Sequence, residues 1–160
     1  MNADVNVRKM SLSDFPGVTE IDQALFGQER LPTWPFPFEV YWREYRPDIR
    51  FVAETEGRLI GFIVGCLVVE DHNRSVLNLR HLGDKPRPSR EVGWIDMIGV
   101  LPGSQHAGIG HMLVDAFCAE CRFEKVEVRA VASEQDAKLR RFLEASGFEA
   151  RDFVIYEKNA

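Results

Sequence analysis

A glycine-containing loop is the feature of this sequence best suited to chemistry. Residues 105–110 read QHAGIG and place Gly108 and Gly110 at the start of an apolar helical pattern. Glycine removes the Cβ atom where a ligand must approach the backbone closely. The first N–H groups of a helix have no partner within it and carry partial positive charge from the helix dipole. The loop therefore predicts a site for a phosphate or pyrophosphate group.

Two well-known phosphate loops do not fit these residues. A Walker loop requires Gly-Lys followed by Ser or Thr, whereas Gly110 is followed by His111 and Met112. A dinucleotide fingerprint requires a third glycine where Leu113 stands. The alternative to a phosphate site is a tight strand-to-helix turn that binds no ligand.

The elements that position this loop can be read from the surrounding pattern. An apolar strand is expected over Trp94–Val100, and Pro102 and Gly103 then turn the chain. The helix after the loop buries a face formed by Ile109, Met112, Leu113, Ala116 and Phe117. Earlier and later periodicity predicts strands at 5–9, 51–55, 59–70, 75–79, 125–131 and 148–158, and helices ending near 26 and spanning 38–45 and 133–146.

Aromatic residues are concentrated between positions 34 and 45, among prolines that favour an extended or turning backbone. Pockets are often lined by aromatic side chains, so Trp34, Phe36 and Tyr41 are candidate substrate-binding residues. The second interpretation is a loop anchored in the core by its aromatic rings. The two interpretations are compatible.

Composition excludes several classes of function. The chain has 160 residues, 45% of them hydrophobic, which fits a single domain over residues 1–160. A net charge of −5, with charges mixed along the chain, argues against nucleic-acid binding. The longest apolar run, Leu59–Val69, is too short to cross a bilayer, and no signal peptide is evident. The three cysteines lack a partner set for zinc and fit the reducing cytoplasm.

The strand and loop together resemble the signature of the GNAT superfamily of N-acetyltransferases, in which Val-x-Pro leads into Gln/Arg-x-x-Gly-x-Gly/Ala. In this chain the signature positions are Val100, Pro102, Gln105, Gly108 and Gly110. The resemblance implies an α+β (α/β) GNAT fold, with a mixed, mostly antiparallel central sheet of six to seven strands flanked by about four helices. A second family signature, near the chain end, is matched only in part. Gly147-Phe148 agrees with it, but Asp136 replaces an Asn and Leu143 replaces a Tyr.

The resemblance also places acetyl-CoA, as acyl donor, in a gap between the fourth and fifth strands, with no metal. The pantetheine arm is expected on the backbone of Ile98, Gly99 and Val100. The pyrophosphate is expected on the loop, and the Asn position of the second signature adds a further cofactor contact. The cofactor-binding candidates here are Gln105, His106, Ala107, Gly108, Ile109, Gly110 and Asp136.

Amide formation requires a base to accept the amine proton and a donor to stabilise the oxyanion. Asp96 is the candidate base, since it is an acidic residue in an apolar strand beside the cofactor segment; Glu91 and Glu70 are weaker candidates. The alternative for Asp96 is a carboxylate at the solvent side or the strand end, in a salt bridge or a cap. The oxyanion donor is expected near Ile98–Val100. No acid is evident, because Leu143 stands where the family has Tyr.

The function implied is an N-acetyltransferase that moves the acetyl group to a primary amine by direct attack in a ternary complex. The Trp34-Pro35-Phe36 segment is loosely similar to the ribosomal-protein alanine acetyltransferase branch, which favours a peptide amine; a small-molecule amine is equally allowed. The alternative is a CoA-binding sensor or interaction module with little catalysis, suggested by Leu143. The chain ends soon after Gly-Phe, so a seventh strand is either reduced or supplied by a homodimer.

Overall fold

The computed structural model describes residues 4–27, 29–30, 35–70, 90–123 and 126–151. The strands in this part of the chain are β1 (Asn6–Lys9), β2 (Ile49–Thr55), β3 (Arg58–Glu70), β4 (Arg90–Val100) and β5 (Glu127–Ala130). The α-helices are α1 (Phe15–Phe26), α2 (Phe38–Tyr45), α3 (Ile109–Phe123) and α4 (Ala137–Ala145). Single 3₁₀ turns at Leu12–Asp14 and Pro102–Ser104 precede α1 and the glycine loop.

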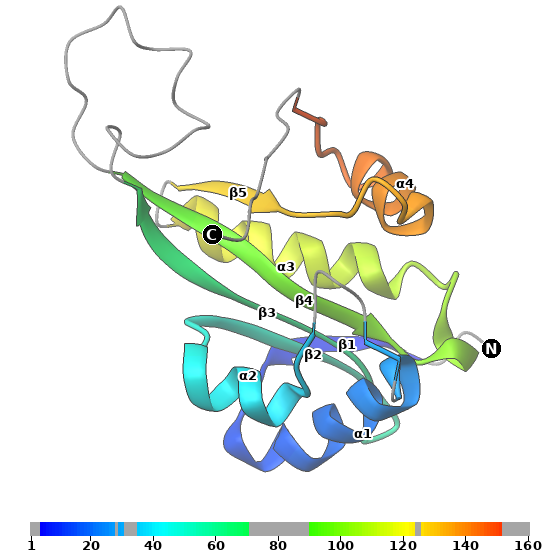
Figure 1. The fold of residues 1–160 in the computed structure, drawn as a ribbon. Helices are drawn as coiled ribbons and strands as arrows, with labels where there is room; N and C mark the ends of the chain where they lie inside the picture. Colours follow the sequence, from blue (N-terminus) through cyan, green and yellow to red (C-terminus); the bar gives the residue numbers. More distant parts are fainter. Residues whose placement is uncertain (1–3, 28, 31–34, 71–89, 124–125, 152–160) are drawn as a thin grey trace, which may run out of the picture.

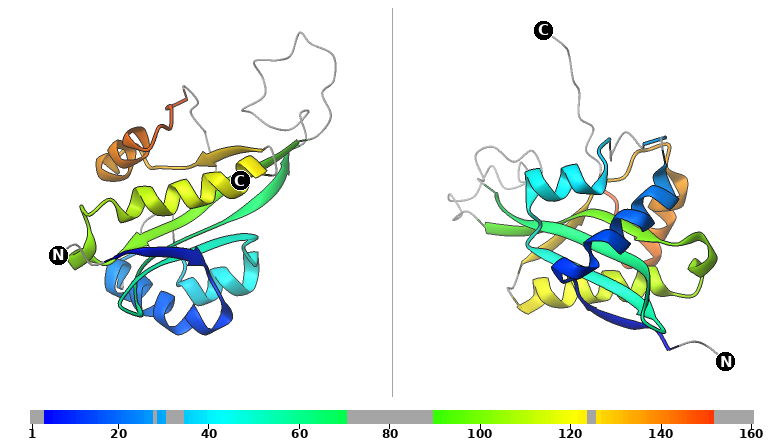
Figure 2. Two further views of the ribbon diagram at one scale, coloured as in Figure 1. Left: turned by 180° about the vertical axis from the view of Figure 1, so that it is seen from behind. Right: turned by 90° about the horizontal axis from the view of Figure 1, so that it is seen from below.

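The five strands form one mixed sheet in the order β1-β2-β3-β4-β5. The first four strands are antiparallel neighbours, and β5 alone runs parallel to β4. Helices α1 and α2 cover one face of the sheet and α3 covers the other (Figures 1 and 2). Helix α4 lies against the N-terminal end of α3. The molecule is therefore a three-layer α/β structure in the described residues.

Apolar side chains on both faces of the sheet form two separate cores. One core lies between the sheet and α3, and includes Ile63, Ile95, Leu113 and Phe117. The other lies between the sheet and helices α1 and α2, and includes Val18, Phe38, Phe62 and Met97. Because both faces are covered, the middle of β3 is apolar without interruption, as is typical of a strand buried on both sides.

Local sequence explains several boundaries. The hairpin between β2 and β3 turns at Glu56 and Gly57, whose φ angles of 50° and 74° match the two positive values of a type I′ turn. Helix α2 begins at Phe38, after Pro37, and ends before Arg46, which is left-handed. The predicted 38–45 helix is therefore confirmed.

Other boundaries differ from the sequence prediction. Strand β4 begins at Arg90, and α4 begins at Ala137 because residues 134–135 form a turn before it. The described residues hold five strands, fewer than the six to seven expected. The predicted strand at 75–79 lies outside the described residues, as does most of 148–158; residues 148–151 are not in a strand.

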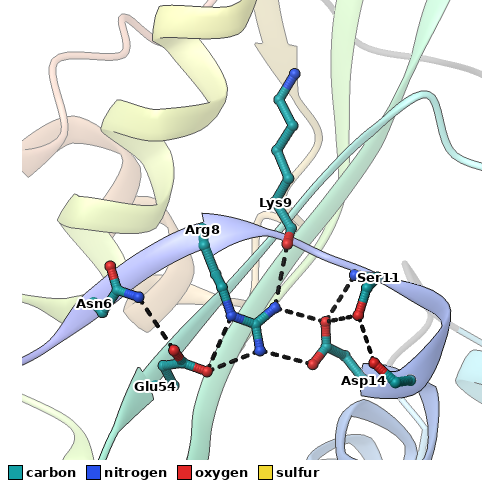
Figure 3. A network of polar contacts seen from close by, with 7 residues as sticks. Asn6, Arg8, Lys9, Ser11, Asp14 and Glu54 are labelled. Carbon is teal, nitrogen blue, oxygen red and sulfur yellow. Dashed lines mark hydrogen bonds and ion pairs between the residues drawn. The ribbon is translucent and has the colours of Figure 1, made fainter. Parts of the chain in front are cut away.

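A charged network connects β1, the strand at one edge of the sheet, to its neighbours (Figure 3). The Arg8 guanidinium donates to both carboxylate oxygens of Asp14, at 2.8 Å each, and also to Glu54 of β2 at 2.8 Å. The Asp14 carboxylate also accepts from the Ser11 backbone N–H at 2.7 Å. The hydrogen bonds from Arg8 hold the pKa of the Asp14 carboxyl well below its usual range. The network keeps Asp14 ionised and joins β1, the first 3₁₀ turn and β2.

Candidate active site

Strand β5 accompanies β4 over only part of its length. The parallel pairing runs from Val92, opposite Glu127, to Ile95, opposite Ala130. Strand β5 then ends, and the chain leads away toward α4 (Figure 1), while β4 continues to Val100. The edge of β4 from residue 96 to 100 therefore has no strand paired on its β5 side in the described residues. Unpaired backbone groups on such an edge can hydrogen-bond an extended ligand.

The glycine loop lies at the end of this edge. His106 and Gly108 both have positive φ angles, of 67° and 78°, and residues 106–108 are exposed. The Met112 N–H donates to the Gly108 carbonyl at 3.1 Å, which is the first hydrogen bond of α3. The N–H groups of residues 109–111 precede that bond, so they are the groups without an intrahelical partner. The structure thus places the start of α3 as the sequence predicts.

The two glycines of the loop have different roles. A Cβ atom on Gly108 would meet no atom within 4 Å, so the space beside it is open. A Cβ atom on Gly110 would lie 2.9 Å from Cε2 of Phe142 in α4. Gly110 therefore makes room for packing between α3 and α4, and Gly108 is the position where the absence of a side chain leaves the backbone accessible.

Gln105 joins the loop to its neighbours through its side chain. Its Nε2 donates to the Val100 carbonyl at 3.0 Å, and its Oε1 accepts from Lys138 Nζ of α4 at 3.2 Å. One of the β4 backbone groups expected to pair with pantetheine is therefore already used within the protein. The same contacts bring the Lys138 ammonium beside the glycine loop, a position that sequence periodicity does not reveal.

Asp136 caps helix α4. Its Oδ1 accepts from the Leu139 backbone N–H at 2.9 Å. Aspartate is a favoured N-cap residue because it satisfies an otherwise unpaired helix N–H group. This side chain, expected near the cofactor, thus has a structural role, and its N-cap preference was the sequence signal that could have shown it.

Asp96 lies at an irregularity in β4. Met97 is opposite Val64 and Ile95 is opposite the adjacent Gly65, so Asp96 is the extra residue of a β-bulge. Bulges re-aim side chains, and here the carboxylate is half-buried beside Tyr41 of α2. The Tyr41 hydroxyl donates to Asp96 Oδ2 at 2.7 Å.

No ion pair neutralises Asp96 within the described part of the chain, and it is not at a strand end. Burial raises the pKa of the Asp96 carboxyl above its ordinary value, whereas hydrogen bonds from Tyr41 and Cys66 act in the opposite direction. Perturbed pKa values are enriched at functional sites, so Asp96 remains the candidate base.

The aromatic segment is divided between core and surface. Phe38 and Tyr41 are 0% and 1% exposed, so their rings belong to the core as the second interpretation expected. Phe36 is 45% exposed. Trp34 lies outside the described residues. Tyr45 stacks on Tyr41 with ring centroids 5.3 Å apart and remains exposed.

A buried ion pair fixes the start of α2. Asp22 of α1 is 0% exposed, and its two oxygens accept from Arg30 at 2.7 and 2.8 Å. Asp22 Oδ2 also accepts from the Phe38 backbone N–H at 3.1 Å. The sequence contained a signal for this pair, because Asp22 falls on the same helical face as Val18 and Ile21.

The remaining candidates have weaker positions. Glu91 is exposed, and the side chain of Glu70 lies outside the described residues. Burial raises the pKa of the Cys66 thiol to about 11, so it stays protonated at neutral pH.

No group of three His, Cys, Asp or Glu side chains in the described ranges could hold a metal ion. None of the described helices is both long and apolar enough to span a membrane.

A β4 edge left unpaired where β5 ends, followed by a glycine loop leading into a helix, is the arrangement of an acyltransferase type of domain. The Acetyltransferase (GNAT) family matches residues 15–148, and the chain therefore belongs to this family. It is accordingly an N-acetyltransferase whose acyl donor is acetyl-CoA.

Solved structures agree on the fold. The aminoglycoside acetyltransferase AAC(6')-Iy, in complex with the bisubstrate analog CoA-S-monomethyl-acetylneamine, is 18% identical with a TM-score of 0.71, and the match covers 99% of each chain. AAC(6')-Ih from Acinetobacter baumannii is 19% identical with a TM-score of 0.70, over 98% of this chain and 99% of that one. A transcriptional regulator from Bacillus halodurans C-125 is 15% identical with a TM-score of 0.70, over 98% and 100%. No curated protein sequence matches the chain.

Proposed function

We propose that this protein transfers an acetyl group from acetyl-CoA to the primary amine of a small molecule, in one ternary complex, with Asp96 as the base. The observation that carries this proposal is the Asp96 carboxylate, which lies on a bulge of β4 where the strand extends past β5, and which no cation of the described residues pairs with. A carboxylate with a raised pKa is a stronger base than an ordinary aspartate.

Acetyl-CoA fits the observed geometry at two places. The Ile98 backbone groups and the Val100 N–H face the unpaired edge of β4 and can pair with an extended amide chain. The exposed loop at Gly108 can receive a pyrophosphate on the N–H groups that start α3. Lys138 adds a positive charge beside that loop. When bound, the thioester supplies an activated acetyl carbon next to β4.

In the proposed acetyl transfer, each bond and proton is accounted for by the two substrates and residues of this chain. The amine nitrogen forms a bond to the acetyl carbon, the carbon–sulfur bond breaks, and Asp96 takes the amine proton. A backbone N–H of β4 between residues 98 and 100 stabilises the oxyanion. The sulfur leaves as a thiolate, which needs no acid from the protein in order to depart.

The proposed acceptor is a small amine because several structural neighbours are aminoglycoside acetyltransferases, one of them in complex with sisomicin. Thiol release should be measured with sisomicin, neamine, simple diamines and peptides with an N-terminal alanine. We expect turnover with a small amine. Faster turnover with the peptides would instead favour the ribosomal-protein branch.

The Asp96→Asn variant tests the base. We expect kcat at pH 7 to fall by about 10² to 10³-fold, with the Kd for acetyl-CoA changed less than about twofold. Unchanged turnover would remove Asp96 from the mechanism. Binding of acetyl-CoA to the parent protein without turnover of any amine would favour the alternative function, a CoA-binding sensor.

A further inference from the structure

The hydroxyl of Tyr41 occupies a position that neither the fold nor the family match explains. It comes from α2, 55 residues before Asp96 in sequence, and donates to Asp96 Oδ2 at 2.7 Å. Its side chain is 1% exposed, so the phenol does not line an open surface. A buried phenol needs a hydrogen-bond partner, but it does not need a carboxylate on a bulge.

The position of this hydroxyl is fixed from several directions. The N–H at the start of α2 is held by the buried Asp22–Arg30 pair. The Tyr41 ring lies 6.3 Å from the Phe38 ring and is stacked on Tyr45. Rigid support of this kind holds a hydrogen-bond donor within a narrow range of angles.

The direction of the hydrogen bond follows from the surroundings. Burial and the neighbouring Asp96 charge raise the pKa of the Tyr41 phenol well above its ordinary value, so the phenol keeps its proton and donates. Among the residues that the structure describes, the other titratable group facing Asp96 is the Cys66 thiol of β3, 3.9 Å from the Tyr41 hydroxyl. No arginine or lysine from α1, α2, β3 or β5 forms an ion pair with Asp96 in the described residues.

We propose that Tyr41 is a positioning residue for the base: its hydroxyl orients the Asp96 carboxylate and favours the ionised form that accepts the amine proton. This inference rests on the proposed function. In this role Tyr41 contacts the base, whereas the sequence pattern predicted that it contacts the substrate. Burial opposes ionisation of Asp96, and a neutral donor offsets part of that effect without placing a cation beside the amine substrate.

The test compares Tyr41→Phe with Tyr45→Phe. Both variants remove a phenol oxygen from the same aromatic stack, but only Tyr41 donates to Asp96. The pKa of the Asp96 carboxyl is measured by carbon-13 NMR, with its signal assigned by comparison with Asp96→Asn. We expect Tyr41→Phe to raise this pKa by about one to two units, because a hydrogen bond to the charged form is lost. Tyr45→Phe should leave the Asp96 pKa unchanged.

The pH dependence of activity should shift in the same direction as the Asp96 pKa. The acid limb of the kcat/KM profile against pH should move to higher pH in Tyr41→Phe by the same amount as the carboxyl pKa, since the base must be ionised. An Asp96 pKa that does not move in Tyr41→Phe would overturn the positioning role, whatever the activity. Absence of turnover with every amine, together with the expected shift of the Asp96 pKa, would instead overturn the proposed function and leave the Tyr41–Asp96 interaction established.

Discussion

Asp14 and Asp96 are two carboxyl groups whose pKa values this fold shifts in opposite directions. Asp14 is joined to Arg8 by two hydrogen bonds of 2.8 Å, and its carboxyl pKa is lowered by them. Asp96 is joined to a phenol and a thiol, and its carboxyl pKa is raised by burial. The first carboxylate is a permanent charge that ties two segments together. The second is half-buried without a cation beside it among the described residues, and its carboxyl holds a proton more tightly than an ordinary aspartate.

Burial alone does not separate the two kinds of carboxylate. Asp22 is more deeply buried than either, at 0% exposure, yet it is paired with Arg30 and holds the start of α2. The feature that distinguishes Asp96 is the absence of an ion-pair partner among the described residues. Asp14 and Asp22 each accept from an arginine, whereas Asp96 accepts from the neutral Tyr41 hydroxyl.

The largest effect on stability is expected from Arg30→Met. This change leaves the fully buried Asp22 carboxylate without its partner, which should lower the free energy of unfolding by about 3 to 5 kcal/mol. Urea denaturation at pH 7 measures it. Arg43→Met is the matched control, because the Arg43–Glu44 pair is 72% and 58% exposed and should contribute less than about 1 kcal/mol. A similar small loss in both variants would contradict a structural role for the Asp22–Arg30 pair.

A smaller loss is expected from Asp14→Asn. The variant should lower the free energy of unfolding at pH 7 by about 2 kcal/mol, since charge-assisted hydrogen bonds to Arg8 are lost. A lowered folded-state pKa stabilises the protein above the ordinary pKa of aspartate, and this contribution disappears as the pH falls. The difference between parent and variant should therefore shrink below about pH 4. A difference that stays constant with pH would show that the ionised carboxylate is not the stabilising group.

The smallest change in stability, with the opposite pH dependence, is expected from Asp96→Asn. A carboxyl with a raised pKa holds its proton more tightly in the folded state, so it favours folding at low pH, and that contribution is lost as the pH rises through the folded pKa. The free energy of unfolding of the variant should stay within about 1 kcal/mol of that of the parent, and it should rise relative to the parent as the pH increases above the ordinary pKa of aspartate. Denaturation curves across that range measure this trend. If the free energy of unfolding of the variant instead fell further below that of the parent as the pH rose, Asp96 would be a stabilising carboxylate like Asp14.

Local patterns predicted much of the fold. The spacing of apolar residues predicted the helix at 38–45 and the strands at 51–55 and 59–70, which correspond to α2, β2 and β3. The two glycines at 108 and 110, and the helical spacing of apolar residues after them, predicted the loop and the start of α3. These features depend on neighbours in sequence, which explains why the sequence alone was sufficient.

Contacts between distant segments were not predictable in the same way. The Tyr41–Asp96 hydrogen bond joins residues 55 positions apart, and it depends on a bulge that shifts the register of β4. The contact of Gly110 with Phe142 requires the placement of α4 over α3. Periodicity reports which face of an element is buried, but it does not report which side chain of another element meets it.

Calorimetric titration with acetyl-CoA tests the central claim most directly. Three proteins should be compared: the parent, Gly108→Trp, and Gly57→Trp as the matched control. Gly108 and Gly57 share positive φ angles, of 78° and 74°, and open space, but Gly57 lies in the β2–β3 turn. We predict micromolar binding by the parent and by Gly57→Trp, and its loss in Gly108→Trp. Equal binding by all three proteins, or no binding by the parent, would contradict the assignment of the glycine loop as the cofactor site.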